Sequence, residues 1–85
     1  MTLPQVTIYG RMSCGYCVRA KDLCEMKGLD YRFVDMIREG ISKAELASSL
    51  GRPVETVPQV LVGSEHVGGY TEFALYLRQK EEAAV

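Results

Sequence analysis

The sequence is short of three things: cysteine, charge of a single sign, and long apolar runs. No stretch approaches the ~20 apolar residues that a membrane-spanning helix needs, so we expect no membrane partner. Ten lysines and arginines stand against 11 aspartates and glutamates, and this balance gives no reason to expect nucleic acid as a partner. Residues 1–10 lack a basic segment followed by an apolar run, which argues against a signal peptide.

The cysteine content limits the class of protein further. Three cysteines are too few, and odd in number, for a scaffold held together by disulfides. We therefore expect a cytoplasmic protein whose thiols are reduced at rest. The 85 residues, 47% hydrophobic and 25% charged, suffice for one modest core, so we expect a single soluble domain over residues 1–85 that acts as a monomer.

Two of the cysteines form the motif Cys14-Gly15-Tyr16-Cys17, at the start of a helical pattern. A helix N-terminus exposes unpaired N–H groups and carries a partial positive charge, so it favours a thiolate over a thiol. The i, i+3 spacing puts the second sulfur one turn along the helix, close enough to close a small disulfide ring. By itself the motif fits either a redox-active dithiol or a zinc site.

Apolar periodicity predicts alternating strands and helices. Strands are predicted at residues 5–9, 31–35, 58–62 and 65–67, the last two joined by a tight turn at residues 63–64. Helices are predicted over residues 14–27, over residues 43–50 and from residue 71 onward, with a loop at residues 38–40 and fraying at residues 80–82. The order β-α-β-α-β-β-α predicts an α/β fold with a four-stranded mixed sheet, in which a crossover helix joins a parallel pair and a hairpin adds antiparallel strands.

Two helix starts have their own signals. Ser42 and Glu45 match a capping box, in which each side chain accepts a hydrogen bond from the other's backbone N–H. Thr71 is the expected N-cap of the last helix, with Phe73 and Leu77 pointing inward.

Three segments together resemble the glutaredoxin family: residues 17–23 (CVRAKDL), 51–59 (GRPVETVPQ) and 67–71 (VGGYT). The resemblance covers nearly the whole chain and is greatest to the small dithiol bacterial type that donates electrons to ribonucleotide reductase. It implies a thioredoxin-like fold with helices on both faces of the sheet. It also implies a glutathione-dependent thiol–disulfide oxidoreductase that reduces protein disulfides and glutathione mixed disulfides.

The two cysteines of the motif have different expected roles. Cys14 is the expected nucleophile because it lies nearer the helix start and nearer solvent, and motifs of this kind lower a cysteine pKa to roughly 3.5–7.5. Arg11 is the nearest candidate for a cation that stabilises its thiolate. Cys17 is the expected resolving cysteine, which attacks a mixed disulfide on Cys14 and releases the reduced product.

The resemblance also implies a glutathione site, and its expected residues are Arg11, Tyr16, Thr56, Val57, Pro58, Tyr70, Thr71 and Glu72. A cis Pro58 would expose the N–H and C=O of Val57 to a peptide-like ligand. The hydroxyl of Thr71 and the helix N-terminus suit the γ-glutamyl carboxylate, and Glu72 suits the ammonium. Arg11 would meet the glycyl carboxylate at the other end.

Each of these assignments has a purely structural alternative. Tyr16 is also compatible with an exposed aromatic residue at a helix start, and Pro58 with a plain proline that opens a strand. Thr71 and Glu72 are compatible with a helix cap and a favourable first-turn acid, and that role does not exclude ligand binding.

Two positions depart from the family pattern. Gly15 stands where this type of glutaredoxin usually has proline, which leaves the cysteine loop softer, and Glu72 stands where aspartate is common. The first departure keeps a second hypothesis open, because some family members with a small residue there resemble carriers of a [2Fe–2S] cluster. In that alternative, Cys14 thiolates and glutathione from two subunits would hold the cluster.

No other metal site is expected. Cys24 falls on the apolar face of the first predicted helix and is interpreted as a small buried hydrophobic residue. His66, the only histidine, lies on a distant predicted strand, where a structural or exposed position is expected. Zinc is disfavoured because these two residues are not expected to meet the Cys14–Cys17 pair.

Overall fold

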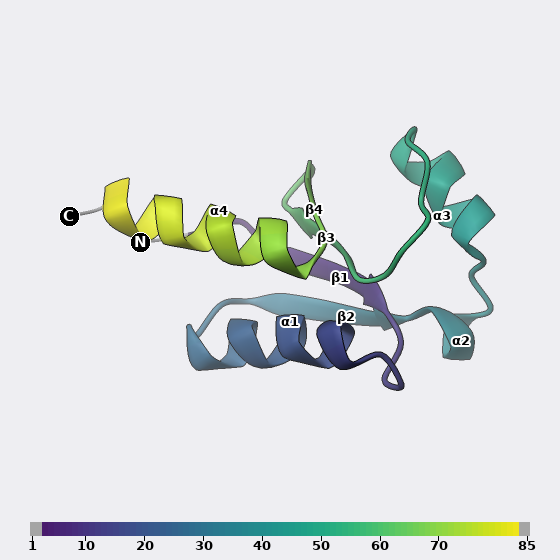
Figure 1. Cartoon of the computed structure of the whole chain (residues 1–85), viewed down its shortest axis with the longest axis horizontal. Helices are drawn as coiled ribbons and strands as arrows, with labels where there is room; N and C mark the ends of the chain where they lie inside the picture. Colours follow the sequence, from purple (N-terminus) through teal and green to yellow (C-terminus); the bar gives the residue numbers. More distant parts are fainter. Residues whose placement is uncertain (1–2, 84–85) are drawn as a thin grey trace.

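The computed structural model describes residues 3–83 and contains one helix more than the sequence predicts (Figure 1). The strands are β1 (Val6–Gly10), β2 (Tyr31–Asp35), β3 (Gln59–Val62) and β4 (Glu65–Gly68), and the helices are α1 (Gly15–Met26), α2 (Met36–Glu39), α3 (Lys43–Leu50) and α4 (Tyr70–Ala83). Within this range no helix combines the length and the apolar character needed to cross a membrane.

The four strands form one mixed sheet in the order β2-β1-β3-β4. β1 pairs in parallel with β2, where Ile8 lies opposite Phe33, and antiparallel with β3, where Ile8 lies opposite Val60. β3 and β4 form the predicted antiparallel hairpin, with a register shift between Val60 and Leu61. The predicted α/β fold, with a parallel crossover pair and an added hairpin, is confirmed.

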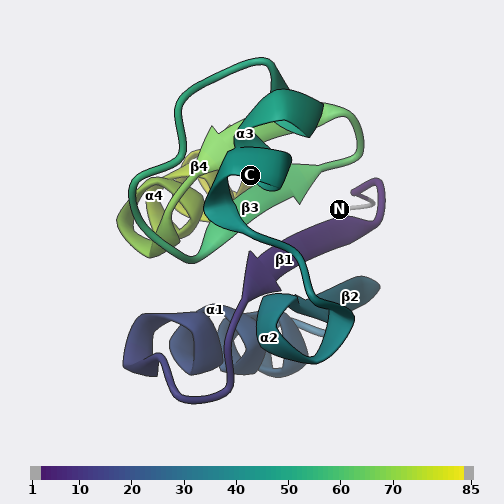
Figure 2. The same cartoon turned by 90° about the vertical axis from the view of Figure 1, so that its right-hand side faces the viewer.

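The main core lies between one face of the sheet and the helices α1 and α4. Its buried members are Val6, Ile8, Ala20, Cys24, Val60, Val62, Phe73 and Leu77. Successive side chains of a strand point to opposite faces, so Tyr9 faces the other side and packs against a second cluster that includes Leu46 of α3. Helices therefore cover both faces. Figure 1 shows α2 and α3 gathered at the end toward which β1 points, and this end faces the viewer in Figure 2.

The short helix α2 corrects the prediction of a loop at residues 38–40. The Asp35 carboxylate accepts hydrogen bonds from the N–H groups of Ile37 at 3.1 Å and Arg38 at 3.2 Å, which is an N-cap arrangement. Gly40 ends the helix in the left-handed region, with φ of 68°. Met36 is buried in the second cluster and fixes the turn to the core.

Several predicted boundaries are wrong by one or a few residues. β1 includes Gly10, which pairs with Asp35, and β3 begins after Pro58, whose nitrogen has no hydrogen to donate to the ladder. The capping box of α3 is confirmed, with the N–H of Glu45 donating to Ser42 Oγ at 3.0 Å and the N–H of Ser42 to Glu45 Oε1 at 3.2 Å.

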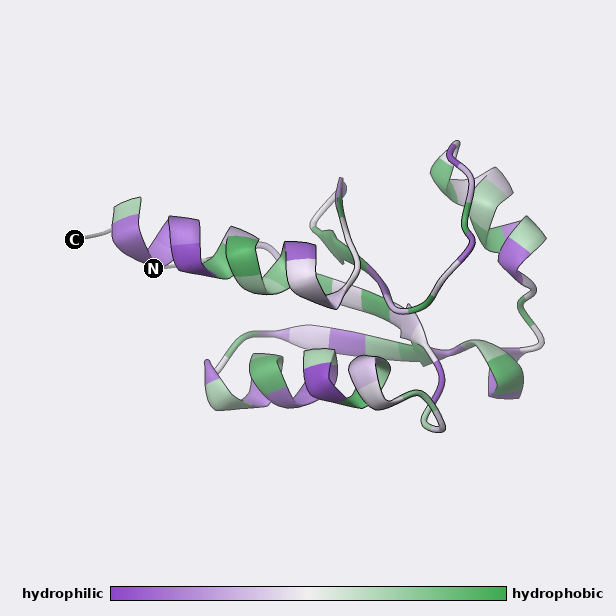
Figure 3. Ribbon diagram, in the orientation of Figure 1, coloured by the Kyte–Doolittle hydropathy of each residue, from purple (hydrophilic) through white to green (hydrophobic). Residues whose placement is uncertain are grey.

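Helix α4 differs from its prediction at both ends. It begins at Tyr70, so Thr71 lies inside its first turn instead of capping it. The C-terminal turns, hydrophilic in Figure 3, continue as helix to Ala83 where fraying was predicted. Ion pairs support these turns, because Lys27 Nζ lies 2.6 Å from Glu81 Oε1 and Arg78 Nε lies 3.6 Å from Glu82 Oε1.

Candidate active site

The loop after β1 delivers Cys14 to the N-cap of α1, as the sequence predicts. Cys14 has extended backbone angles, and its Sγ accepts a hydrogen bond from the N–H of Cys17 at 3.4 Å. The N–H of Cys14 donates to the carbonyl of Arg11 at 3.1 Å, which closes the turn before the helix. Cys14 is half-buried and Cys17 fully buried, so only the first sulfur is open to a substrate.

The environment of Cys14 favours its thiolate. Burial acts to raise the pKa of Cys14, but the hydrogen bonds it accepts from the Cys17 thiol and from the N–H groups of Cys17 and Tyr16 outweigh burial, and the nearby Arg11 charge adds to them. The net result is a pKa below the ordinary value for a thiol. The predicted contribution of Arg11 is present, although the helix start contributes more.

Cys17 has the opposite character. Burial, together with the hydrogen bond to Cys14, raises its pKa to about 12, so it is a neutral thiol near pH 7. Its sulfur packs tightly against β1, since a Cβ atom added at Gly10 would lie 2.6 Å from Cys17 Sγ. The pair therefore consists of one reactive sulfur and one protonated sulfur held behind it.

The loop before β3 faces the cysteines across a narrow gap. The peptide bond between Val57 and Pro58 is cis, as the resemblance implies. The thiol of Cys14 donates to the carbonyl of Val57 over 3.7 Å, so the reactive sulfur lies beside the backbone of this loop. The Cys14 sulfur and the backbone of Val57 thus border the same gap.

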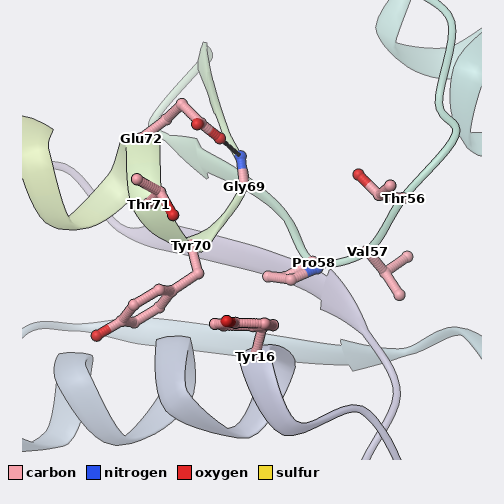
Figure 4. A pocket seen from close by; sticks show the side chains of 8 residues that line it. All are labelled: Tyr16, Thr56, Val57, Pro58, Gly69, Tyr70, Thr71 and Glu72. Atoms are coloured by element: carbon pink, nitrogen blue, oxygen red, sulfur yellow. Dashed lines mark hydrogen bonds between the residues drawn. The ribbon is translucent and has the colours of Figure 1, made fainter.

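A pocket of about 270 Å³ opens beside this gap (Figure 4). Three separate segments of the chain contribute its lining residues, Tyr16, Thr56, Val57, Pro58, Gly69, Tyr70, Thr71 and Glu72. Seven of the eight residues predicted for glutathione are among them. The sequence analysis missed Gly69, for which the only signal was a glutamate three residues further along, as in a capping box.

Two aromatic rings form one wall of the pocket. The ring centroids of Tyr16 and Tyr70 lie 5.8 Å apart in a tilted arrangement, and Figure 4 shows the two rings side by side at the pocket's edge. The guanidinium of Arg19 lies 5.3 Å from the centroid of the Tyr16 ring. Tyr16 remains 56% exposed, so its ring borders the pocket and also faces solvent.

Glu72 caps the helix that borders the pocket. Its Oε1 accepts a hydrogen bond from the N–H of Gly69 at 2.8 Å (Figure 4), and the N–H of Phe73 donates to the carbonyl of Gly69 at 2.9 Å. Gly69 is thus the N-cap where Thr71 was predicted. The longer side chain of glutamate turns back onto the helix start, and this hydrogen bond uses one of its two carboxylate oxygens.

Arg11 is the one predicted glutathione residue that does not line this pocket. It borders a second cavity of about 160 Å³, which Val57 also lines. The other lining residues are Met36, Ile37, Ile41 and Lys43. The Nε of Arg11 is buried and has no hydrogen-bond partner within residues 3–83. The two cavities thus adjoin at Val57, and the sequence analysis gave no signal for Lys43.

The remaining candidate ligands are not brought together. Cys24 is buried in the main core, and His66 hydrogen-bonds to Gln59 on the neighbouring strand. In the part of the chain that the structure describes, no three or more His, Cys, Asp or Glu side chains are grouped so that they could hold a metal ion.

Comparisons with known proteins agree with this geometry. The family model for Glutaredoxin matches residues 2–67. Glutaredoxin 1 of Escherichia coli K12 is 46% identical over 84 residues, which cover 93% of this chain and 99% of that protein. The solution structure of reduced E. coli glutaredoxin has a TM-score of 0.80 at 46% identity, over 92% of this chain and 98% of its own. A buckwheat glutaredoxin–glutathione complex has a TM-score of 0.73 at 28% identity, over 88% and 69% of the two chains.

Proposed function

The chain belongs to the glutaredoxin family of thiol–disulfide oxidoreductases, and we propose that it reduces glutathione mixed disulfides and protein disulfides with glutathione as the electron donor. Cys14 carries the proposal, because it is an accessible thiol with a lowered pKa beside a pocket of suitable size. The similar structure of the buckwheat glutaredoxin–glutathione complex supports glutathione as the ligand.

The reaction on a glutathione mixed disulfide needs only the first sulfur. The Cys14 thiolate attacks the glutathione sulfur, the old S–S bond breaks, and the substrate leaves as a thiolate that takes up a proton from water. Cys14 is then joined to glutathione. A second glutathione thiolate attacks that bond, which releases oxidised glutathione and restores the Cys14 thiolate.

A protein disulfide also needs Cys17. The Cys14 thiolate attacks one sulfur of the substrate disulfide and forms a mixed disulfide with it, while the substrate S–S bond breaks and the other substrate sulfur leaves as a thiolate that takes up a proton from water. Cys17, which holds its proton at neutral pH, loses it as it attacks Cys14, and the leaving substrate sulfur gains a proton. The substrate is now a dithiol and the enzyme carries a Cys14–Cys17 disulfide. Two glutathione molecules reduce that disulfide in two exchanges and become oxidised glutathione.

We place glutathione in the 270 Å³ pocket. Its cysteine backbone would pair with the N–H and C=O of Val57, in the manner of an added strand. Its γ-glutamyl carboxylate would meet the N-terminus of α4 and the hydroxyl of Thr71. The second carboxylate oxygen of Glu72 suits the ammonium, and Arg11, across Val57, suits the glycyl carboxylate.

Serine variants of the two cysteines test the proposal. With glutathione as reductant, Cys17→Ser should keep activity on a glutathionylated peptide and lose activity on a protein disulfide, because only the second reaction needs the resolving sulfur. Cys14→Ser should lose both activities. Full activity of Cys14→Ser on either substrate would show that the nucleophile is assigned wrongly.

Ribonucleotide reductase is the specific protein substrate that we propose, acting in a reducing compartment such as the cytoplasm. The resemblance to the small dithiol bacterial type supports this choice. The test is turnover of an oxidised ribonucleotide reductase with glutathione and this protein as the only electron source. No turnover, with glutathionylated peptide reduced normally, would reject this substrate and leave the general activity standing.

A glutathione-ligated [2Fe–2S] cluster is the second candidate function, and the open space beside Gly15 is the observation that favours it. One chain offers a single accessible thiol, Cys14, because Cys17 and Cys24 are buried. A four-thiolate site would therefore need two chains and two glutathiones, whereas we propose a monomer for the redox reaction. A colourless, monomeric protein after purification with glutathione without oxygen would exclude the cluster.

A further inference from the structure

Gln59 is a buried polar residue next to Pro58, which lines the pocket, and its side chain makes hydrogen bonds in two directions. It is the first residue of β3, follows the cis proline and is only 8% exposed. Its Nε2 donates to the carbonyl of Thr56 at 2.8 Å, and its Oε1 lies 2.6 Å from Nε2 of His66 on β4. A buried amide with both ends bonded is rigidly held, because losing either partner would leave a buried polar atom unsatisfied.

These contacts fix the state of His66. Because Gln59 Oε1 can only accept, Nε2 of His66 must donate and carry the proton. Its Nδ1 then has a free lone pair in the neutral ring, and Nη1 of Arg52 lies 3.4 Å away as a donor. The chain of contacts runs Arg52, His66, Gln59, Thr56, and both of its ends lie in the loop between α3 and β3.

We propose that His66 and Gln59 are positioning residues for disulfide exchange, which hold the loop of residues 51–58 so that the backbone of Val57 faces Cys14. The loop is not part of a β-strand pair, yet the carbonyl oxygen of Val57 lies 3.7 Å from Cys14 Sγ. His66 ties it to the sheet at two points, directly at Arg52 and through Gln59 at Thr56. Neither residue lines the pocket.

The inference rests on the proposed binding of peptide-like substrates along Val57. Lys43 Nζ also holds the loop, because it donates to the carbonyl of Glu55 at 3.0 Å, and Val54 is buried in the second cluster. The contacts through His66 are those that tie the loop to β3 and β4. A loop that is already in its bound conformation saves the substrate the entropy of ordering it. The thiolate of Cys14 owes its stability to α1 and Arg11, not to this chain of contacts. Loosening the loop should therefore weaken attack on a peptide disulfide and leave the intrinsic reactivity of Cys14 unchanged.

The test compares His66→Leu with His66→Gln in the full chain. The leucine variant fills a similar space without a donor, whereas the glutamine side chain can still donate an N–H to Gln59. For a glutathionylated peptide, kcat/KM should fall about fivefold in His66→Leu, as expected for one lost net hydrogen bond, and recover in His66→Gln. Gln59→Leu should reproduce the loss. Alkylation of Cys14 by iodoacetamide, which is too small to need the loop, should keep its wild-type pH profile in all three variants.

Tyr31→Phe is the control, because it removes a side-chain hydrogen bond that is exposed, to Glu25, and lies far from the loop; its kcat/KM should equal that of the wild type. Equal kcat/KM in His66→Leu and the wild type, with both folded by circular dichroism, would overturn the inference and leave the proposed function intact. A changed alkylation profile would overturn it too, by showing that His66 acts on Cys14 itself. A wild type unable to reduce the peptide would instead reject the proposed function, and the inference with it.

Discussion

At the scale of single residues, the chemistry depends on the difference between two sulfurs three positions apart. Cys14 accepts hydrogen bonds at the open start of α1, and Cys17 is buried against β1. The same hydrogen bond between the two thiols lowers the pKa of Cys14 and raises the pKa of Cys17. One contact therefore adds to both effects: it works with the N–H groups at the helix start to favour the Cys14 thiolate, and with burial to keep Cys17 protonated.

Arg11→Gln should make Cys14 less reactive at neutral pH. Removing the guanidinium charge removes one of the causes that lower the pKa of Cys14, so the thiolate fraction at pH 7 falls and the midpoint of iodoacetamide alkylation moves to higher pH. Arg32→Gln, an exposed change on β2, should leave the profile unchanged. An unmoved midpoint in Arg11→Gln would mean that the helix start alone stabilises the thiolate.

Gly10→Ala should destabilise the reduced protein by about 1–3 kcal/mol, the usual range for overpacking. The added methyl group would lie 2.6 Å from Cys17 Sγ and 2.9 Å from its Cβ, so Cys17 or β1 has to shift. Urea denaturation measures the loss. Gly15→Ala is the control, because nothing lies within 4 Å of its new methyl group; equal stability of the two variants would show that the contact at Gly10 relaxes freely.

At the scale of elements, the strands and long helices follow from the sequence, whereas the short pieces around the site do not. The capping box at Ser42 and the short β-branched, apolar run of β1 are local patterns, and both predicted real elements. Helix α2 is four residues long, too short for any periodicity to reveal. The signal for this helix was the carboxylate of Asp35 followed by a buried Met36. The same local pattern also fits a strand that ends and is followed by a loop, so it does not distinguish the two structures.

Asp35→Ala should therefore loosen α2 and lower the free energy of unfolding by about 0.5–2 kcal/mol, the range for loss of an N-cap. Asp35 Oδ1 accepts from two N–H groups of the helix, and alanine leaves both without this acceptor. Asp35→Asn keeps an acceptor oxygen and should retain most of the stability. If the asparagine variant lost as much as the alanine variant, charge rather than capping would explain the effect.

At the scale of the whole molecule, the candidate site is assembled from segments that the sequence keeps far apart. Tyr16, the loop at residues 56–58 and the start of α4 line one pocket only because the sheet order brings β1, β3 and β4 together. Family resemblance predicted this grouping, whereas periodicity alone did not. Neither predicted the contact of Gln59 with His66, which joins two strands whose register shifts between Val60 and Leu61.

The place of His66 in the fold makes the stability of the protein depend on pH. Burial and the nearby Arg52 charge lower the pKa of His66 below its ordinary value of 6.5. The unfolded chain then binds the proton more readily than the folded one, so the free energy of unfolding falls as the pH drops below about 6.5 and the loss levels off below the folded pKa. Urea titrations between pH 5 and 8 measure the slope. His66→Gln, which has nothing to titrate there, should show a smaller slope, and an identical slope would assign the effect to other groups.

The burial of Cys17 also has a consequence for the order of events in time. An adduct on Cys14 can react with two competing thiols. One is an outside thiol, which reaches it from solvent, and the other is Cys17, whose pKa is raised by burial and which must first lose its proton. Attack by Cys17 is thus slowed because Cys17 must lose its proton, whereas the rate of attack by a thiol from solvent depends on the concentration of that thiol. The lifetime of the adduct therefore depends on the concentration of reduced glutathione, which decides whether an outside thiol or Cys17 reacts with it first.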